Sequence, residues 1–189
     1  MTKEELRKLY SVKRKKLSAS ECAFFNQKLV HHFFSSINLS QIKVIHTYLP
    51  ISKNNEPGTW KIIEMIQREF PQIRISVPRV ADDRVFENFY FEGLHQLQTS
   101  AWGIQEPKQG IKTPVEEIDM VLVPLLVIDR RGHRVGYGKG YYDRFLKTCN
   151  RDCKTIGLSF FKPVELITDT IDSDVTLNSC VEPSGIHYF

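Results

Sequence analysis

The first forty residues place apolar positions among charged ones at the spacing of an α-helix. Thr2 with Glu5 three residues later forms the capping-box pattern that begins many helices, and apolar residues follow three or four positions apart. We therefore predict a helix over residues 3–16. Ser18 and Glu21 repeat the capping pattern ahead of a broader apolar stripe, which predicts a second helix packed on a core.

The middle of the chain alternates short β-rich segments with a helical one. Residues 43–49 and 73–77 are rich in β-branched and other apolar residues, and each segment is expected to stop at the proline that follows it. Between them, Thr59 can cap a helix that extends through Phe70. The alternation over residues 84–92 favours an exposed strand or a hairpin arm.

A nearly continuous apolar run over residues 120–127 predicts a central strand that is covered on both faces. Pro124 lies within this run and requires a local break in the hydrogen bonding of the strand. The pattern after it predicts a loop over residues 128–140, a helix over residues 141–148 and a strand over residues 155–160. The functional chemistry is expected beyond the carboxyl end of the central strand.

This alternation of strands and helices predicts the fold class. We expect an α/β protein: a three-layer sandwich with a mostly parallel central sheet, Rossmann-like and similar in architecture to sugar-phosphate isomerases and CoA-transferases. The polar segment over residues 105–114 is expected to be a surface loop. No internal repeat, low-complexity tract or linker divides the sequence, so we predict one domain over residues 1–189.

Charge changes this picture at one end of the chain. Of 189 residues, 41% are hydrophobic and 25% are charged, as in ordinary globular proteins, and the formal net charge of +4 derives largely from basic residues near the N-terminus. Three interpretations of this basic face stay open: a solvated helix surface, a contact with an anion or nucleotide, or non-specific binding of nucleic acid.

Two further features concern the cellular compartment. The four cysteines lack paired CxxC spacing and are expected to be reduced, structural thiols. No apolar run approaches the roughly 20 residues that a membrane span needs, and the N-terminus is charged where a signal peptide would be apolar. We therefore expect a cytoplasmic protein with no membrane partner.

The segment between the central strand and the following helix holds glycine at three alternate positions. Gly136, Gly138 and Gly140 leave backbone N–H groups accessible, so the loop can surround an anion at the positive end of the next helix. Lys139 lies between two of these glycines and Arg134 lies just upstream, and both can reach phosphoryl oxygens. The segment therefore predicts phosphate binding.

Asp143 follows this loop and is a natural ligand for Mg²⁺ beside phosphate. The loop is not a Walker A motif, because no Gly-Lys-Ser/Thr occurs, and it departs from G-x-G-x-x-G because Tyr141 replaces the third glycine. The alternative is a glycine-rich turn in which Asp143 only caps the helix. Arg134 and Lys139, taken together with Asp143, favour phosphate and metal.

The run from Val123 to Asp143 resembles the signature of the 5-formyltetrahydrofolate cyclo-ligase family, whose members are also called 5,10-methenyltetrahydrofolate synthetases. The resemblance extends over most of the chain. Its other motifs are Lys3-x-x-x-Arg7 with Arg14-x-x-Leu17-Ser18, Tyr48-Leu49-Pro50 with Glu56, Val77-Pro78-Arg79, Trp102-Gly103-Ile104-Gln105-Glu106-Pro107 and Ile156-Gly157-Leu158-Ser159-Phe160.

The resemblance implies a role for each matching residue. Residues implied to bind ATP are Lys3, Arg7, Arg134, Gly136, Tyr137, Gly138, Lys139, Gly140, Tyr141 and Tyr142. Residues implied to contact folate are Leu49, Glu56, Tyr137, Tyr141 and Trp102, the last of which would cover the pterin. Residues implied to act in catalysis are Lys139, Arg134 and Tyr141. Simpler roles stay open, since Leu49 can be core, Trp102 a hydrophobic plug and Lys3 a solvated charge.

The resemblance also implies a metal site that includes Asp143. A second carboxylate is expected near the C-terminus, where the chain departs from the usual pattern of the family. Asp172 is our candidate and Asp174 is the alternative. Both can equally be solvated loop acids.

The activity implied by the resemblance is cyclisation of 5-formyltetrahydrofolate to 5,10-methenyltetrahydrofolate, with ATP and Mg²⁺ and with release of ADP and phosphate. The formyl oxygen is phosphorylated, the second folate nitrogen closes the ring and phosphate leaves. The alternative is a phosphate-binding isomerase or CoA-transferase-like enzyme that does not hydrolyse ATP. We expect a monomer that acts on small molecules and binds no nucleic acid, since the sequence holds no RNA-recognition or zinc-finger pattern.

Overall fold

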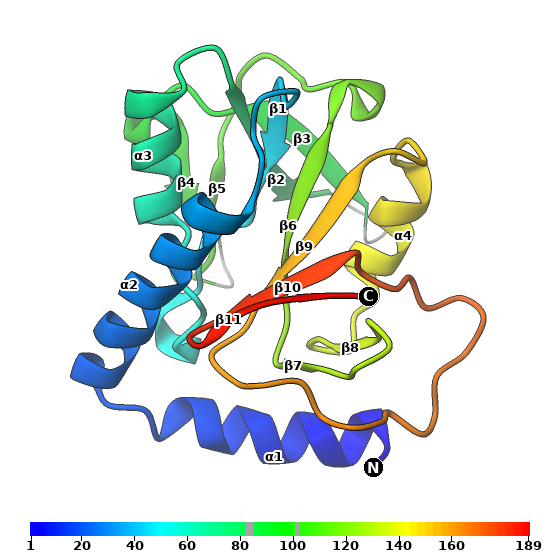
Figure 1. Ribbon diagram of the computed structural model, residues 1–189. Helices are drawn as coiled ribbons and strands as arrows, with labels where there is room; N and C mark the ends of the chain where they lie inside the picture. The colour runs from blue at the N-terminus through cyan, green and yellow to red at the C-terminus, as the bar shows by residue number, and fades with distance from the viewer. Residues whose placement is uncertain (82–84, 101–102) are drawn as a thin grey trace.

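A seven-stranded sheet forms the centre of the described part of the protein (Figure 1). The computed structural model describes residues 1–81, 85–100 and 103–189. The strands of this sheet are β1 Val44–His46, β2 Arg74–Val80, β3 Phe86–Tyr90, β6 Met120–Pro124, β9 Lys154–Leu158, β10 Ser179–Glu182 and β11 Gly185–Tyr188. Their order is β11-β10-β9-β6-β1-β2-β3; the inner strands are parallel, and β3 and β11 run antiparallel at the two edges.

Helices and short hairpins surround this sheet. The α-helices are α1 Lys3–Lys15, α2 Ala19–Ser36, α3 Trp60–Glu69 and α4 Tyr141–Thr148. The hairpins are β4 Leu97–Thr99 with β5 Gln105–Pro107 and β7 Val127–Ile128 with β8 Arg134–Val135. Three short 3₁₀-helices are η1 Ser52–Asn54, η3 Leu94–Gln96 and η4 Val115–Glu117.

Both faces of the sheet are covered by helices, which confirms the predicted three-layer α/β class. In Figure 1, α2 and α3 lie against one face and α4 lies against the other, while α1 lies below the sheet beside β7 and β8. One core cluster includes Phe33 of α2 and Ile66 of α3; the second includes Val121 of β6 and Phe145 of α4. The four predicted helices form within one residue of their expected bounds.

The prediction that the second strand stops at Pro78 was wrong, because β2 continues to Val80. Alternate residues of a strand direct their backbone groups to opposite neighbours. The carbonyl of Ser76 accepts from the N–H of Thr47 on the β1 side, so Pro78 faces that same side, beyond the end of β1. No hydrogen bond is lost there, and β2 still pairs with β3 through Val80.

Two other predictions about secondary structure need correction. The expected surface loop over residues 105–114 begins as β5, which pairs antiparallel with β4. The β10 and β11 strands were not predicted, although β10 is buried and completes the parallel part of the sheet. Segments of three or four residues contain too few positions for a period to be recognised, so their pairing depends on the neighbouring strand.

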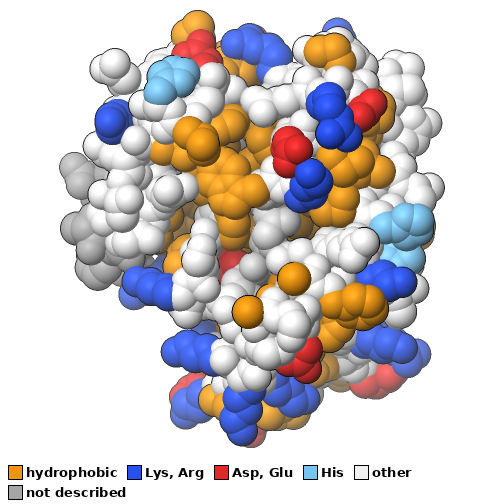
Figure 2. Space-filling model, turned by 90° about the vertical axis from the view of Figure 1, so that its left-hand side faces the viewer, with side chains coloured by type: hydrophobic (Ala, Val, Ile, Leu, Met, Phe, Trp, Pro, Cys, Tyr) orange, Lys and Arg blue, Asp and Glu red, His pale blue; other side chains and the backbone are white. Residues whose placement is uncertain are grey.

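The basic N-terminus divides into an outer and an inner set. Four exposed lysines of its first turns face solvent: Lys8, Lys13, Lys15 and Lys16. In Figure 2, Lys and Arg side chains gather at the bottom of the molecule, where α1 lies in Figure 1. Lys3, Arg7 and Arg14 instead lie on the side of α1 that faces the rest of the protein, and their contacts define part of the candidate site.

Candidate functional site

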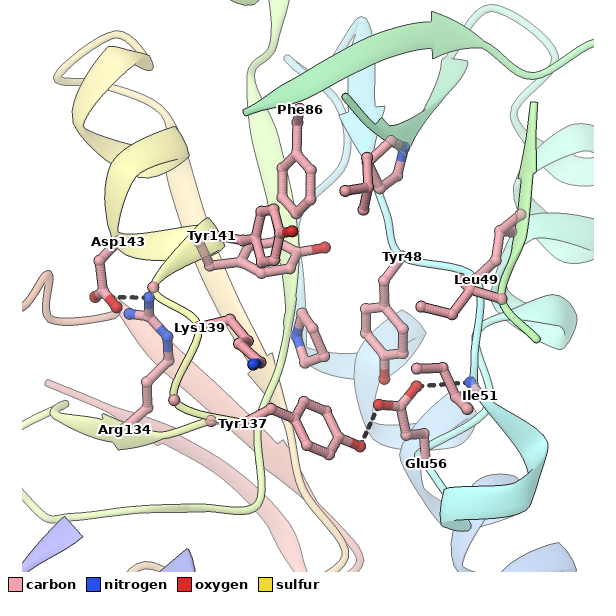
Figure 3. A pocket seen from close by; sticks show the side chains of 18 of the residues that line it. Tyr48, Leu49, Ile51, Glu56, Phe86, Arg134, Tyr137, Lys139, Tyr141 and Asp143 are labelled. Carbon is pink, nitrogen blue, oxygen red and sulfur yellow. Dashed lines mark hydrogen bonds and ion pairs between the residues drawn. The ribbon is translucent and has the colours of Figure 1, made fainter. Parts of the chain in front are cut away.

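A cavity of about 490 Å³ lies at the carboxyl ends of the central strands, where a parallel α/β sheet is expected to bind ligands (Figure 3). Tyr48 follows β1, and Val80 and Pro124 end β2 and β6. The glycine loop before α4 forms one wall, and the segment around η1 forms the opposite wall. The other residues that line the cavity are Lys3, Arg7, Leu49, Ile51, Glu56, Pro78, Phe86, Ile104, Gln105, Glu106, Arg134, Gly136, Tyr137, Gly138, Lys139, Gly140, Tyr141, Tyr142, Asp143 and Asp174.

The glycine loop needs glycine for different reasons at different positions. Gly138 and Gly140 have φ angles of 83° and 68°, in the left-handed region that side chains disfavour. A Cβ at Gly138 would also lie 3.1 Å from Cζ of Arg7. Gly136 has an ordinary φ, and no atom lies within 4 Å of where its Cβ would be. Since Gly136 lines the cavity, this open space leaves its backbone accessible to a ligand.

Two cations of α1 border this loop. The Arg7 Nε donates a 2.9 Å hydrogen bond to the carbonyl of Gly136, and Lys3 forms an ion pair with Asp174. Lys139 extends its side chain into the cavity from the loop itself (Figure 3). The structure therefore brings Lys3, Arg7 and Lys139 to one wall of the cavity, a concentration of positive charge that suits phosphate groups.

The buried guanidinium of Arg134 and the partly exposed carboxylate of Asp143 form one end of the same wall. Nη2 of Arg134 lies 2.8 Å from Oδ1 of Asp143, and its Nη1 donates to the carbonyl of Val175 at 2.6 Å. Only 6% of the Arg134 side chain is exposed, and this burial lowers the pKa of its guanidinium while Asp143 opposes the shift. Both residues were predicted site residues, and their pairing orients them towards the cavity.

A buried carboxylate lies on the opposite wall. Glu56 accepts a 2.7 Å hydrogen bond from the N–H of Ile51 at Oε2 and a hydrogen bond from the Tyr137 hydroxyl at Oε1 (Figure 3). Burial raises the pKa of Glu56, and these hydrogen bonds and the charge of Arg14 act in the opposite direction. Tyr137 thus spans the cavity from the glycine loop to the Glu56 wall.

Aromatic rings form the upper wall of the cavity in Figure 3. The rings of Phe86 and Tyr141 stack with a centroid distance of 5.3 Å and an interplanar angle of 9°. Phe86 comes from the edge strand β3 and was not predicted as a site residue; the alternation of that strand gave no sign of its function. Leu49 is buried and also lines the cavity, so its core role and its predicted contact role are compatible.

Tyr48 is positioned by the hydroxyl of Thr59, a residue that we expected to cap α3. Thr59 stands at the N-cap position of α3, but its side chain makes no capping hydrogen bond. The hydroxyl of Thr59 instead donates to the carbonyl of Tyr48 at 2.7 Å, and the Tyr48 hydroxyl donates to the carbonyl of Pro57 at 2.7 Å. The prediction that Thr59 caps the helix with its side chain was therefore wrong.

Two predicted site residues, Asp172 and Tyr142, differ from the rest in their surroundings. Asp172 is exposed and does not line the cavity, whereas the alternative, Asp174, does. Trp102 lies outside the described residues. Tyr142 lines the cavity with its ring, while its hydroxyl is buried with no hydrogen-bond partner among the described residues.

Arg14 is a second residue, after Phe86, whose role in this site the sequence did not reveal. It is 3% exposed and donates to the Tyr137 hydroxyl from α1. Its position was visible in the sequence, because Lys3, Arg7 and Arg14 share the spacing of one helical face. Six other basic residues lie in the same helical segment, and spacing alone does not separate a buried cation from solvated neighbours.

The cavity has two facing walls: one presents cations and glycine backbone, and the other presents aromatic rings and a buried carboxylate. This arrangement is typical of α/β enzymes that bind a phosphorylated ligand beside an organic substrate. The comparison with known proteins narrows this class. The profile of the 5-formyltetrahydrofolate cyclo-ligase family matches residues 1–173, and the chain belongs to this family. The family membership predicted from the sequence motifs is thereby confirmed.

Several relatives match over nearly their whole length. The chain is 30% identical to the 5-formyltetrahydrofolate cyclo-ligase of Mycoplasma pneumoniae over 179 residues, which cover 94% of this chain and 97% of the relative. The solved 5,10-methenyltetrahydrofolate synthetase of Aquifex aeolicus has a TM-score of 0.85 at 26% identity and covers 100% of this chain and 93% of its own. The solved synthetase of Mycoplasma pneumoniae has a TM-score of 0.76 at 28% identity, with 96% and 98% covered.

Two kinds of feature are absent from the described residues. No group of three or more His, Cys, Asp or Glu side chains there is arranged to hold a metal ion. None of the described helices has the length and apolar character needed to cross a membrane.

Proposed function

We propose that this protein catalyses the ATP-dependent cyclisation of 5-formyltetrahydrofolate to 5,10-methenyltetrahydrofolate, with release of ADP and phosphate. The observation that carries the proposal is the single cavity in which a cationic glycine loop faces Glu56 and stacked aromatic rings. Membership of the cyclo-ligase family supports it, and the alternative of an isomerase or CoA-transferase-like activity is not favoured by the relatives found.

The cationic wall is proposed to bind ATP. Accessible backbone at Gly136 and the charges of Lys3, Arg7 and Lys139 suit a polyphosphate chain. ATP supplies the phosphoryl group that makes the formyl oxygen a leaving group. Lys139 is proposed to stabilise the negative charge on that group during transfer, and Arg134, held by Asp143, is proposed to do so from one end of the same wall.

The opposite wall is proposed to bind the folate. Ionised Glu56 would accept hydrogen bonds from pterin N–H groups, and the Tyr141 ring stacked on Phe86 offers a flat surface against the ring system. In this arrangement the protein positions the formyl group and excludes water, and no covalent nucleophile is needed.

Two carboxylates that line the cavity fit a Mg²⁺ ion beside phosphate. Oδ2 of Asp143 has no hydrogen-bond partner among the described residues, and Asp174 is held by Lys3 and by the N–H of Ile171. Mg²⁺ is commonly bound by one or two carboxylates together with substrate phosphates. We propose that Asp143 and Asp174 would hold the ion, which would neutralise phosphate charge when bound.

Asp143→Asn is expected to raise the Mg²⁺ concentration needed for half-maximal turnover by about tenfold, the effect of losing roughly 1.4 kcal/mol of ion binding. The measurement is a Mg²⁺ titration of the initial rate at saturating ATP. Asp152→Asn, at an exposed loop position, is the matched control and should titrate as the wild type does. An unchanged titration in Asp143→Asn would remove this residue from the metal site.

The proposed activity is tested by mixing the protein with 5-formyltetrahydrofolate and Mg²⁺, with and without ATP. We expect ATP-dependent growth of the near-ultraviolet absorbance of the methenyl product, with stoichiometric release of ADP. Folded protein that gives neither signal would contradict the proposal and return the isomerase-type alternative to first place.

A further inference from the structure

Arg14 is a buried cation that no direct ion pair neutralises among the described residues. Its Nε donates to the carbonyl of Asn54 at 2.9 Å, and its Nη1 donates to the carbonyl of Leu125 at 3.1 Å. Its Nη2 donates to the Tyr137 hydroxyl. With 3% of the residue exposed, this charge has lost nearly all contact with water, and such a loss costs several kcal/mol unless the surroundings compensate for it.

The compensation comes through one intervening hydroxyl. Tyr137 accepts from Arg14 and donates to Oε1 of Glu56, so a cation, a phenol and a carboxylate form a continuous chain of hydrogen bonds. Charge-assisted hydrogen bonds of this kind are about twice as strong as neutral ones. The second oxygen of Glu56 is held by the N–H of Ile51, so both ends of the carboxylate have a defined direction.

This chain joins the two walls of the cavity. Arg14 contacts the Glu56 wall through the carbonyl of Asn54 in η1, and it contacts the glycine loop through Tyr137. Its backbone carbonyl also accepts from Nδ2 of Asn55, which lies next to Glu56 in the sequence. The contacts of Arg14 therefore connect the glycine loop with the segment around η1.

We propose that Arg14 is a positioning residue for the folate substrate. It holds the Tyr137 hydroxyl against Glu56, and this contact orients the carboxylate that binds the pterin. Through Tyr137, the same contact connects Glu56 to the glycine loop. This role rests on the proposed function, since it assumes that Glu56 binds the folate. Arg14 itself does not line the cavity. Its effect on the substrate therefore passes through Tyr137 and Glu56.

The charge of Arg14 should appear in the pH dependence of folate use. The other titratable groups that act on Glu56 or face it are the phenols of Tyr48, Tyr137 and Tyr142, and burial raises the pKa of each, so they stay neutral. Arg14 is thus the cation that favours the ionised form of Glu56. Without it, the pKa of Glu56 rises further, because no positive charge opposes the effect of burial.

The test compares Arg14→Met, Arg14→Lys and Tyr137→Phe with the wild type in steady-state kinetics across pH. Because removal of one partner of a buried charge pair destabilises the fold, the melting temperature of each variant is measured alongside its kinetics. For Arg14→Met we expect the KM for 5-formyltetrahydrofolate to rise about tenfold, the value of one hydrogen bond to a charged group, with the KM for ATP within twofold. The acidic limb of kcat/KM for folate should move to higher pH by about one unit, and Arg14→Lys should restore part of that shift.

The matched control is Lys15→Met, which removes an equal charge from the exposed neighbouring position of α1 and should leave all constants unchanged. Tyr137→Phe should reproduce the folate-specific loss, and the Arg14→Met/Tyr137→Phe double variant should lose little more than either single one. If Arg14→Met does not fold, Tyr137→Phe and Arg14→Lys still test the positioning role.

Three outcomes would overturn the positioning role. They are a wild-type folate KM and pH profile in Arg14→Met, an equal rise of both KM values together with a lower melting temperature, and a wild-type folate KM in Tyr137→Phe. A wild-type protein without cyclo-ligase turnover would contradict the proposed function itself, and the role of Arg14 in folate binding with it.

Discussion

Lys139→Ala is expected to lower kcat by about 10²–10³-fold, the usual cost of removing one group that stabilises charge in a transition state. Lys139 is exposed in the glycine loop and points into the cavity from between two glycines with positive φ (Figure 3). Its charge is therefore available to a phosphoryl group. Because the side chain packs against no core cluster, its loss should change the free energy of unfolding by less than about 0.5 kcal/mol.

The measurement is single-turnover formation of the methenyl product, with far-ultraviolet circular dichroism and a thermal melt to establish that the variant is folded. Lys147→Ala removes the same charge from the exposed face of α4 and should retain normal turnover. Lys139→Arg should recover part of the rate because a cation is restored. Near-normal turnover in Lys139→Ala would show that the loop does not stabilise phosphoryl charge through this residue.

Glu56→Gln is expected to raise the KM for 5-formyltetrahydrofolate by about 10- to 100-fold, which corresponds to the loss of about 1.5–3 kcal/mol for hydrogen bonds to a charged group. Glutamine preserves the size of the side chain and an acceptor for the N–H of Ile51. It removes the negative charge that the pterin N–H groups and the Tyr137 hydroxyl would share. The KM for ATP should stay within twofold, because the nucleotide wall is unchanged.

The same substitution should lower the free energy of unfolding by a similar 1.5–3 kcal/mol, because Arg14 keeps its buried charge and loses the carboxylate at the end of its hydrogen-bond chain. Steady-state kinetics with each substrate varied in turn and urea unfolding measure the two effects. Glu64→Gln, on the exposed face of α3, is the control for removal of a surface carboxylate. A folate KM within twofold of the wild type would exclude Glu56 from the folate site.

Local pattern predicted most of the scaffold. The helices α1 and α2 each carry a complete capping box, and α4 begins directly after Gly140, so their bounds depend on groups within a few residues. The apolar run over residues 120–127 was equally local, but the predicted length of this strand was wrong: β6 ends at Pro124, and Val127–Ile128 form β7 in a separate hairpin. The failures were β5, β10 and β11, which are only three or four residues long and so carry no recognisable period of their own.

The residues of the candidate site likewise divide into those that the sequence indicated and those that it did not. The glycine loop with Lys139, Arg134 and Asp143 is one continuous segment, so its residue types and spacing were readable without a structure. Phe86 and Arg14 were not, because each contacts a tyrosine of the glycine-loop region from a segment far away in the sequence. The choice between Asp172 and Asp174 likewise needed the fold, since only Asp174 turns towards Lys3 and the cavity.

The sequence by itself determined the α/β class, the helices, the phosphate-type loop and the family, because these follow from periodicity, capping and contiguous motifs. Only the tertiary structure decided which cations of α1 are buried, which aromatic ring stacks on Tyr141, and that Tyr137 links Arg14 to Glu56 across the cavity. Side chains from α1, from the segment around η1, from β3 and from the glycine loop meet there because the parallel strands end at one edge of the sheet. A one-dimensional pattern carries no information about which distant residues such an edge brings within hydrogen-bond distance.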